Sequence, residues 1–99
     1  MVGGTTSVDP DGVVVGETAY DQAAEALRKI ERSLGRAGVG LGDVVSVRVY
    51  VTDISLADQV GRAFGEALGE VRPLMTMVEV SGLIDPRMLV EIETVALVG

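Results

Sequence analysis

The sequence predicts an α+β fold, a two-layer sandwich in which two helices pack on one face of a mixed sheet. The chain has 99 residues, of which 47% are apolar, and this suffices for one domain with one core. Two segments repeat apolar residues with helical spacing, and runs of β-branched residues lie before, between and after them. We therefore treat residues 1–99 as a single domain.

The N-terminal segment is typical of a β-hairpin. Residues 1–8 resemble the end of a strand, Asp9-Pro10-Asp11-Gly12 predicts a turn, and residues 13–15 predict a short returning strand. A terminal strand without an upstream neighbour is an exposed sheet edge. We therefore expect the natural protein to begin upstream of Met1, with a further N-terminal strand.

The first helix is predicted over residues 19–37. Thr18 can cap its N-terminus, with Asp21 in the third position of a capping-box variant, and Gly38 suits the left-handed conformation that ends many helices. Its apolar stripe consists of Ala23, Leu27, Ile30 and Leu34. The basic residues fall mostly on the other faces and are expected to be solvated, namely Arg28, Lys29, Arg32 and Arg36.

The second helix is predicted to start at Ser55, because Asp58 follows at the third position, and to end at Gly69. Gly61 and Gly65 lie one turn apart inside it, at a cost of about 1 kcal/mol each relative to alanine. We expect another backbone to approach the helix closely there. The predicted buried stripe consists of Leu56, Val60, Ala63, Phe64 and Ala67.

Three further runs predict the remaining strands. In residues 43–53 the alternation places one uniformly apolar face under the helices, formed by Val45, Val47, Val49 and Val51. The opposite face is mixed and bears Arg48 and Tyr50. Residues 73–80 and 88–96 carry acidic side chains at alternating positions and are separated by turn signals at Ser81-Gly82 and Asp85-Pro86.

This order of elements predicts two βαβ-like units in a sheet of four or five strands. Because both helices cover the same face, the other face has no cover from within the chain. That face includes Tyr50, Thr52 and many aliphatic residues, so it predicts self-association.

The composition excludes several classes of function. The chain has no Cys and no His, which removes disulfides, thiolate or imidazole metal sites, and Ser-His-Asp or Cys-His catalysis. Its net charge of −7, without a basic cluster, opposes nucleic-acid binding. Neither a membrane span nor a signal peptide is readable, so a cytoplasmic protein without metal or other cofactor is expected.

The residues resemble the reactive-intermediate deaminase family, also called the Rid, YjgF or endoribonuclease L-PSP family. The likeness spans nearly the whole chain. In order, it is carried by Gly3-Gly4-Thr5, Gln22 with Ala26-Leu27, Ala37-Gly38, Asp43-Val44-Val45, Val49 to Asp53, Arg72-Pro73, Val78-Glu79-Val80, Val90 to Glu93, and Ala96.

The resemblance implies a chorismate-mutase-like fold of the bacillary type and a homotrimer with ligand clefts between subunits. It also implies hydrolysis of 2-iminoacids, the reactive imine or enamine products of pyridoxal-phosphate enzymes, to ammonia and a 2-ketoacid. The family's first strand, which contributes to the cleft, is expected to be missing from residues 1–99.

Two residues depart from the family pattern. Family deaminases carry Pro-x-Arg-Ser/Thr, and that arginine clamps the substrate carboxylate, but the matching residue here is Met75. A thioether cannot make the charge-assisted bidentate contact of a guanidinium. Gly61 replaces a common asparagine. Arg72 lies on the other strand face by parity, which leaves Arg48 and Arg87 as other cations that could reach the cleft.

The resemblance also implies the candidate site residues. Glu91 occupies the position of the family glutamate that holds or activates water, so it is the candidate catalytic residue; otherwise it is an exposed or interface strand residue. The candidate ligand-binding cleft consists of Gly4, Thr5, Phe64, Met75 and Met77. Alternatively, Met75 and Met77 are packing groups, and Gly3-Gly4-Thr5 is a plain turn.

Three functions follow as hypotheses. The first is a Rid-like protein that binds a small metabolite in a cleft between subunits of a trimer, with altered or residual imine/enamine hydrolysis. The second is a genuine 2-iminoacid deaminase that uses a different arginine. The third is a non-enzymatic regulatory or chaperone-like trimeric module.

Overall fold

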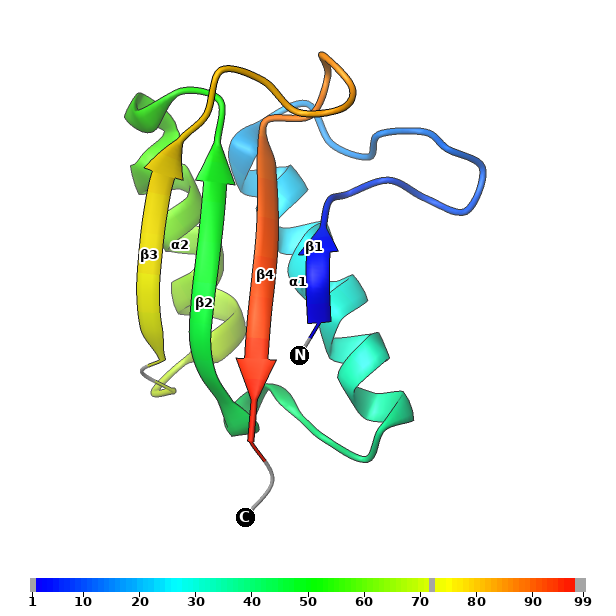
Figure 1. The fold of residues 1–99 in the computed structure, drawn as a ribbon, viewed down its shortest axis with the longest axis vertical. Coiled ribbons are helices and arrows are strands. Elements are labelled where there is room, and N and C mark those ends of the chain that lie inside the picture. Colours follow the sequence, from blue (N-terminus) through cyan, green and yellow to red (C-terminus); the bar gives the residue numbers. More distant parts are fainter. Residues whose placement is uncertain (1, 72, 98–99) are drawn as a thin grey trace.

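Four strands form one mixed sheet, and two helices lie against one of its faces (Figure 1). The computed structural model describes residues 2–71 and 73–97. The predicted two-layer α+β fold is confirmed. In chain order the elements are β1 (Val2–Thr5), α1 (Ala19–Arg36), β2 (Val44–Val51), α2 (Ala57–Leu68), β3 (Leu74–Glu79) and β4 (Val90–Ala96).

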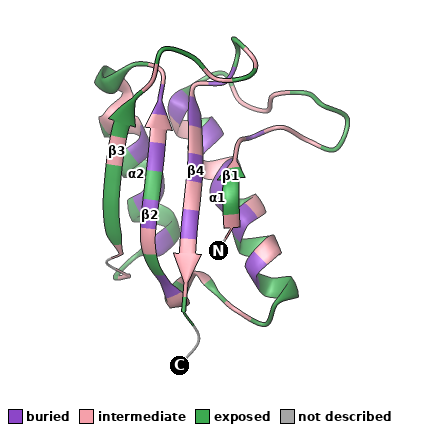
Figure 2. Ribbon diagram, in the orientation of Figure 1, coloured by how far each residue is buried: buried purple, intermediate pink, exposed green. Residues whose placement is uncertain are grey.

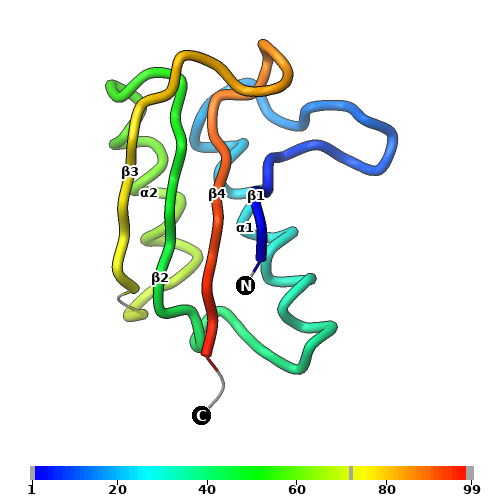
Figure 3. Tube along the Cα trace, viewed as in Figure 1, coloured from blue at the N-terminus to red at the C-terminus, as the bar shows by residue number. Residues whose placement is uncertain are grey.

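The strand order along the sheet is β1-β4-β2-β3. Strands β2 and β3 are parallel neighbours joined through α2, which is a true βαβ unit. The other predicted unit is split, because β4 pairs antiparallel with both β1 and β2 and separates them. The predicted strand at residues 13–15 is only an isolated bridge between Val8 and Val14, within a loop that leaves the edge of the sheet (Figure 3).

The core lies between the helices and the sheet. Buried positions recur along one side of each helix and alternate along β2 and β4 (Figure 2). The predicted stripe of α1 is confirmed, since all four of its apolar residues are buried. The largest fully buried apolar side chains are Leu27, Ile30, Ile92, Val47, Val49, Val51, Val60 and Val90.

The predicted core face of β2 is wrong at its first position. Val47, Val49 and Val51 are buried as predicted, but Val45 is 40% exposed and Val44 is buried in its place. The register with β4 shifts between Val44 and Ser46. Such an irregularity adds one residue to one strand, so it reverses the in–out alternation on one side of the shift.

The start and stripe of α2 also differ from the prediction. The helix begins at Ala57, directly after a short 3₁₀ turn at Ile54–Leu56. Asp53 caps that turn, since its carboxylate accepts a hydrogen bond from the Ser55 amide at 2.9 Å. Ala67 is exposed, and Leu68 is buried instead. The end at Gly69 is confirmed, with a positive φ of 59°.

The expectation of close backbone approach at Gly61 and Gly65 is wrong within one chain. Both glycines are exposed, and a Cβ atom added to either one would meet nothing within 4 Å. Their low helix propensity is therefore not offset by any packing that the single chain supplies.

Gln22 joins α1 to the loop that precedes β4. Thr18 caps the helix as predicted, accepting a hydrogen bond from the Asp21 amide at 3.1 Å, and Gln22 follows on the buried side. The Gln22 side chain donates to the carbonyls of Gly16 and Arg87 and accepts from the Leu89 amide at 2.8 Å. One buried amide therefore satisfies three backbone groups in two different loops.

The loop that precedes β4 contains an ion pair between Asp85 and Arg87, and its contribution to stability depends on pH. The Arg87 side chain and backbone N–H both donate to the Asp85 carboxylate, and these bonds lower the pKa of Asp85 from 3.8 to about 2. Because the folded-state pKa is depressed, the carboxylate stabilises the fold above about pH 4, and this contribution is lost as the pH falls towards 2.

Replacing Arg87 with alanine should therefore raise the pKa of Asp85 towards 3.8, though the backbone N–H would keep it somewhat below. NMR titration of the Asp85 carboxyl group measures this shift directly. Urea denaturation at pH 7 and pH 2 should show a smaller loss of stability on acidification in the variant. An unchanged pKa for Asp85 would contradict the assigned cause.

Candidate functional site

The helix-free face of the sheet carries the polar side chains that the sequence singled out. Residues paired across neighbouring strands project to the same face. Tyr50 pairs with Glu91, and Arg48 pairs with both Glu93 and Thr76. Their neighbours Val49 and Ile92 are fully buried beneath the helices. Glu91, Glu93, Tyr50 and Arg48 therefore share the face that neither helix covers (Figure 1).

Glu91 lies directly against Gly4 of the edge strand β1. A Cβ atom built on Gly4 would lie 2.1 Å from Oε1 of Glu91 and 2.9 Å from its Cδ. No side chain fits at residue 4 while the carboxylate keeps this position. Gly3, by contrast, would accept a Cβ with nothing within 4 Å. The structure thus brings together two of the predicted site residues, Gly4 and Glu91.

Thr5 is adjacent in the chain, but its side chain belongs to the other face. It pairs with Ile92, a residue of the core, and its hydroxyl donates to the Gly3 carbonyl at 3.0 Å. The register between β1 and β4 is irregular between Val2 and Thr5. This irregularity contains the Gly3-Gly4 pair, so the two glycines let β1 deform beside the carboxylate.

A second polar group lies beside Glu91 on the same face. The Tyr50 hydroxyl donates to the Glu93 carboxylate. The pKa of Arg48 is raised by a hydrogen bond with Tyr50 and by the charges of Tyr50 and Glu93. Among the described residues, Arg48 is the one cation that the strand register places on this face with Glu91.

The remaining predicted cleft residues lie on the helix side of the sheet. Met75 pairs with Val47 and Met77 with Val49, so both methionines share the face of the buried valines. Met77 packs against the core, Met75 is 44% exposed at the sheet edge, and Phe64 is a core residue that is 3% exposed. Within one chain the sheet therefore separates these three residues from Glu91.

Two other charged side chains, Glu79 and Arg87, make local contacts away from Glu91. Glu79 accepts a hydrogen bond from the Ile54 amide at 2.8 Å, so it helps to hold the turn before α2. Arg87 is engaged by Asp85 and lies in the exposed loop. Arg72 lies outside the described residues.

Sequence reasoning missed the contact between Gly4 and Glu91, because it depends on β4 pairing with β1. No local pattern in a single sequence specifies which distant strand inserts between two others. It also missed the role of Gln22, although a glutamine among apolar residues on the buried side of a helix is a usable signal of a buried hydrogen-bond network.

No helix in residues 2–71 and 73–97 has the length and apolar character needed to cross a membrane. The same residues contain no group of three or more metal-ligating side chains.

Comparison with known proteins shows that the sequence is similar to members of one family. Residues 1–98 match the family model described as endoribonuclease L-PSP. A RutC family protein of Pyrococcus horikoshii is 35% identical over 98 residues, covering 97% of this chain and 76% of the relative.

Two solved structures share the fold. One is a member of the YjgF/YER057c/UK114 family from Mycobacterium tuberculosis, with 47% identity, a TM-score of 0.89, and coverage of 98% of this chain and 76% of the other. The second is a protein of the conserved Rid family from Yersinia pestis, with 31% identity, a TM-score of 0.88, and coverage of 96% and 76%.

Proposed function

Because the chain belongs to the endoribonuclease L-PSP family, also called the YjgF or Rid family, we propose that it is a Rid-like small-molecule-binding protein with altered or residual imine/enamine hydrolysis. The single observation that carries this proposal is the packing of the Glu91 carboxylate against Gly4 on the helix-free face. A carboxylate in an open, glycine-lined position can contact a ligand or a water molecule directly.

The proposed site is completed by neighbouring copies in a homotrimer. The helix-free face bears Leu74 and Val78, which the register places beside Ser46 and Tyr50 and which are 79% and 39% exposed. Apolar residues on an uncovered sheet favour association with another surface. Association would also extend the cleft, because Met75 is 44% exposed on the edge strand β3 and can contact a neighbouring copy, whereas Met77 packs against the core of its own chain.

Light scattering measures the assembly directly. The proposal predicts a mass three times that of one chain. A monomeric mass at the concentrations used for ligand binding would contradict a cleft between subunits.

The chemistry proposed for Glu91 is proton transfer in the hydrolysis of a C=N bond. The water oxygen attacks the imine carbon while the carboxylate accepts a water proton and passes it to the nitrogen. The carbinolamine hydroxyl proton then passes through the carboxylate to the nitrogen, and the C=O bond forms as the C–N bond breaks and ammonia departs. The products are ammonia and a 2-ketoacid, so the atoms balance without any cofactor.

Replacing Glu91 with glutamine should lower the hydrolysis rate by about a hundredfold or more, because an amide cannot accept the proton. The assay supplies 2-aminoacrylate from a coupled dehydratase and follows pyruvate release. Glu79→Gln is the matched control, since a glutamine can still accept the Ile54 hydrogen bond. A wild-type rate equal to that without protein would refute hydrolysis of this substrate and favour the regulatory-module hypothesis.

One observation favours the genuine deaminase as the second candidate. Arg48 shares the helix-free face with Glu91, so a guanidinium for the substrate carboxylate is present even though Met75 has replaced the family arginine. Under this alternative, Arg48→Lys would raise KM for 2-aminoacrylate more than it lowers kcat, because it weakens carboxylate binding and leaves proton transfer intact.

A further inference from the structure

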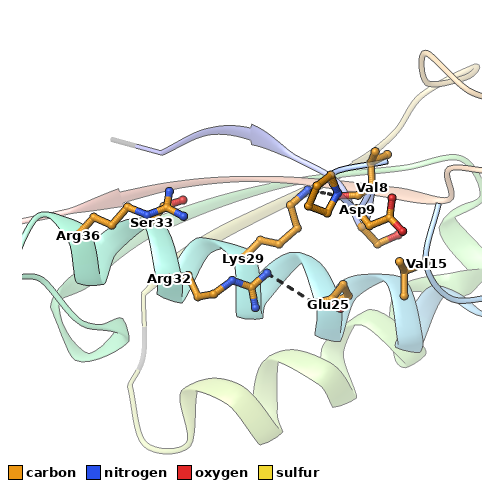
Figure 4. A pocket seen from close by; sticks show the side chains of 10 residues that line it. Val8, Asp9, Val15, Glu25, Lys29, Arg32, Ser33 and Arg36 are labelled. Carbon is orange, nitrogen blue, oxygen red and sulfur yellow. Dashed lines mark hydrogen bonds and ion pairs between the residues drawn. The ribbon is translucent and has the colours of Figure 1, made fainter. Parts of the chain in front are cut away.

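A cavity on the helix side of the molecule has no part in the proposed hydrolysis. It lies between α1 and the loop of residues 7–15 and has a volume of about 660 Å³ (Figure 4). This volume is within the range of small-molecule sites, which is roughly 300–1,000 Å³. Glu91 and the helix-free face of the sheet do not contribute to its walls.

One wall of this cavity is a stripe of hydrogen-bond donors along α1, namely Lys29, Arg32, Ser33 and Arg36. Their positions correspond to i, i+3, i+4 and i+7, which places all four on one helix face. The chain has a net charge of −7, yet four of its eight basic residues fall between residues 28 and 36. The basic face predicted to be merely solvated therefore lines a cavity.

Many N–H groups of this stripe have no acceptor among the described residues. The Lys29 ammonium donates to the carbonyls of Thr6 and Val8, each at 2.7 Å, which leaves one of its three N–H groups. The Arg32 guanidinium is 4.0 Å from Glu25 and makes no closer ion pair within the described part of the chain. Arg36 has neither a hydrogen bond nor an ion pair with any described side chain.

The two acidic residues of the cavity, Glu25 and Asp9, both already have partners, and one partner of Glu25 is Arg32 in the cavity wall. Glu25 contacts Arg28 at 3.4 Å, and the Asp9 carboxylate accepts from the amides of Asp11 and Val13, both at 2.9 Å. Figure 4 shows both acids at the opposite end of the cavity from Arg36. The end near Arg36 is therefore the positive end.

The loop provides an apolar wall opposite the donors. Val8, Pro10 and Val15 line this side of the cavity. A ligand that fills the cavity would thus present an anion to α1 and an apolar body to the loop.

We propose that this cavity binds a phosphomonoester with a small apolar body. Arg32 and Arg36 lie one helical turn apart on the helix face that they share with Lys29, so flexible guanidinium and ammonium groups on one wall can donate to the three terminal oxygens of a phosphate dianion. A carboxylate has only two oxygens and would occupy a single guanidinium. Lys29 also holds the loop through its two carbonyl contacts, so it fixes the shape of the site.

The test is a calorimetric titration of the protein with phenyl phosphate, with inorganic phosphate and benzoate as comparison ligands. We expect phenyl phosphate to bind most tightly and its affinity to fall as the salt concentration rises. Arg36→Ala should weaken binding by about tenfold, because it removes a charge-assisted contact. Arg62→Ala is the matched control, since it removes the same charge from an exposed position on α2 that neither lines the cavity nor pairs with either of its acids.

Equal losses from Arg36→Ala and Arg62→Ala would overturn the site, because they would indicate only the general charge of the chain. Equal affinity for phenyl phosphate and inorganic phosphate would overturn the proposed contact between the apolar wall and the body of the ligand. No heat at millimolar phenyl phosphate would overturn the proposal as a whole. Circular dichroism of both variants shows whether folding is retained, which exposed helix positions such as these should allow.

Discussion

Replacing Gln22 with leucine should lower the free energy of unfolding by about 4 kcal/mol. The side chain is 2% exposed and satisfies the Gly16 carbonyl, the Arg87 carbonyl and the Leu89 amide. Leucine fills a similar volume but leaves these three backbone groups unpaired, at roughly 1–3 kcal/mol for each group that stays buried. Urea denaturation monitored by far-UV circular dichroism measures the change.

Gln59 provides the comparison for this prediction. Its side chain accepts one hydrogen bond, from the Tyr20 amide at 3.2 Å, in a half-buried position. Gln59→Leu should therefore cost only about 1 kcal/mol. If both leucine variants lost the same stability, the network around Gln22 would not be the tie between α1 and the loop before β4.

Replacing Gly4 with alanine should abolish most of the function of the proposed site while preserving the fold. The new Cβ would lie 2.1 Å from Oε1 of Glu91, so the carboxylate must move. Because it is the end of a flexible side chain, it can rotate away at little cost to stability. A displacement of about 1 Å at a reacting group can lower the rate about a hundredfold.

Gly3 supplies a matched control in the same strand. A Cβ atom at Gly3 meets nothing within 4 Å, so Gly3→Ala should retain wild-type pyruvate release and ligand affinity. Neither glycine has a positive φ, so neither substitution strains the backbone. If Gly4→Ala retained full function, the carboxylate would not need its position against β1, and its proposed role would fail.

The helices and the core were predictable because their signals are local. Helical spacing identified Ala23, Leu27, Ile30 and Leu34, and all four are buried. Thr18 caps the start of α1 and Gly69 ends α2. Both depend only on neighbouring residues in the chain, and both were predicted correctly. Errors arose where one residue changes the alternation, as at Val44 and Val45, or where a short turn precedes a helix, as the 3₁₀ turn capped by Asp53 does before α2.

The site was only partly predictable, because it depends on long-range pairing. Glu91 and Gly4 were both identified through the family resemblance, but their contact follows from the position of β4 beside β1. Parity within single strands also could not show that Met75 and Glu91 project to opposite faces, since that requires the register through β2. The cavity beside α1 could not be predicted, because one of its walls is the loop of residues 7–15 and no periodicity in the sequence determines the path of that loop.

The proposed function places a small 2-ketoacid or its imine on the helix-free face beside Gly4 and Glu91. The most direct measurement is an NMR titration of ¹⁵N-labelled protein with pyruvate, the product of the proposed hydrolysis. We expect the amide shifts to centre on Gly3, Gly4, Tyr50 and Glu91 and to disappear in Gly4→Ala. Shifts confined to α1 and the loop of residues 7–15, or no shifts at millimolar pyruvate, would contradict it.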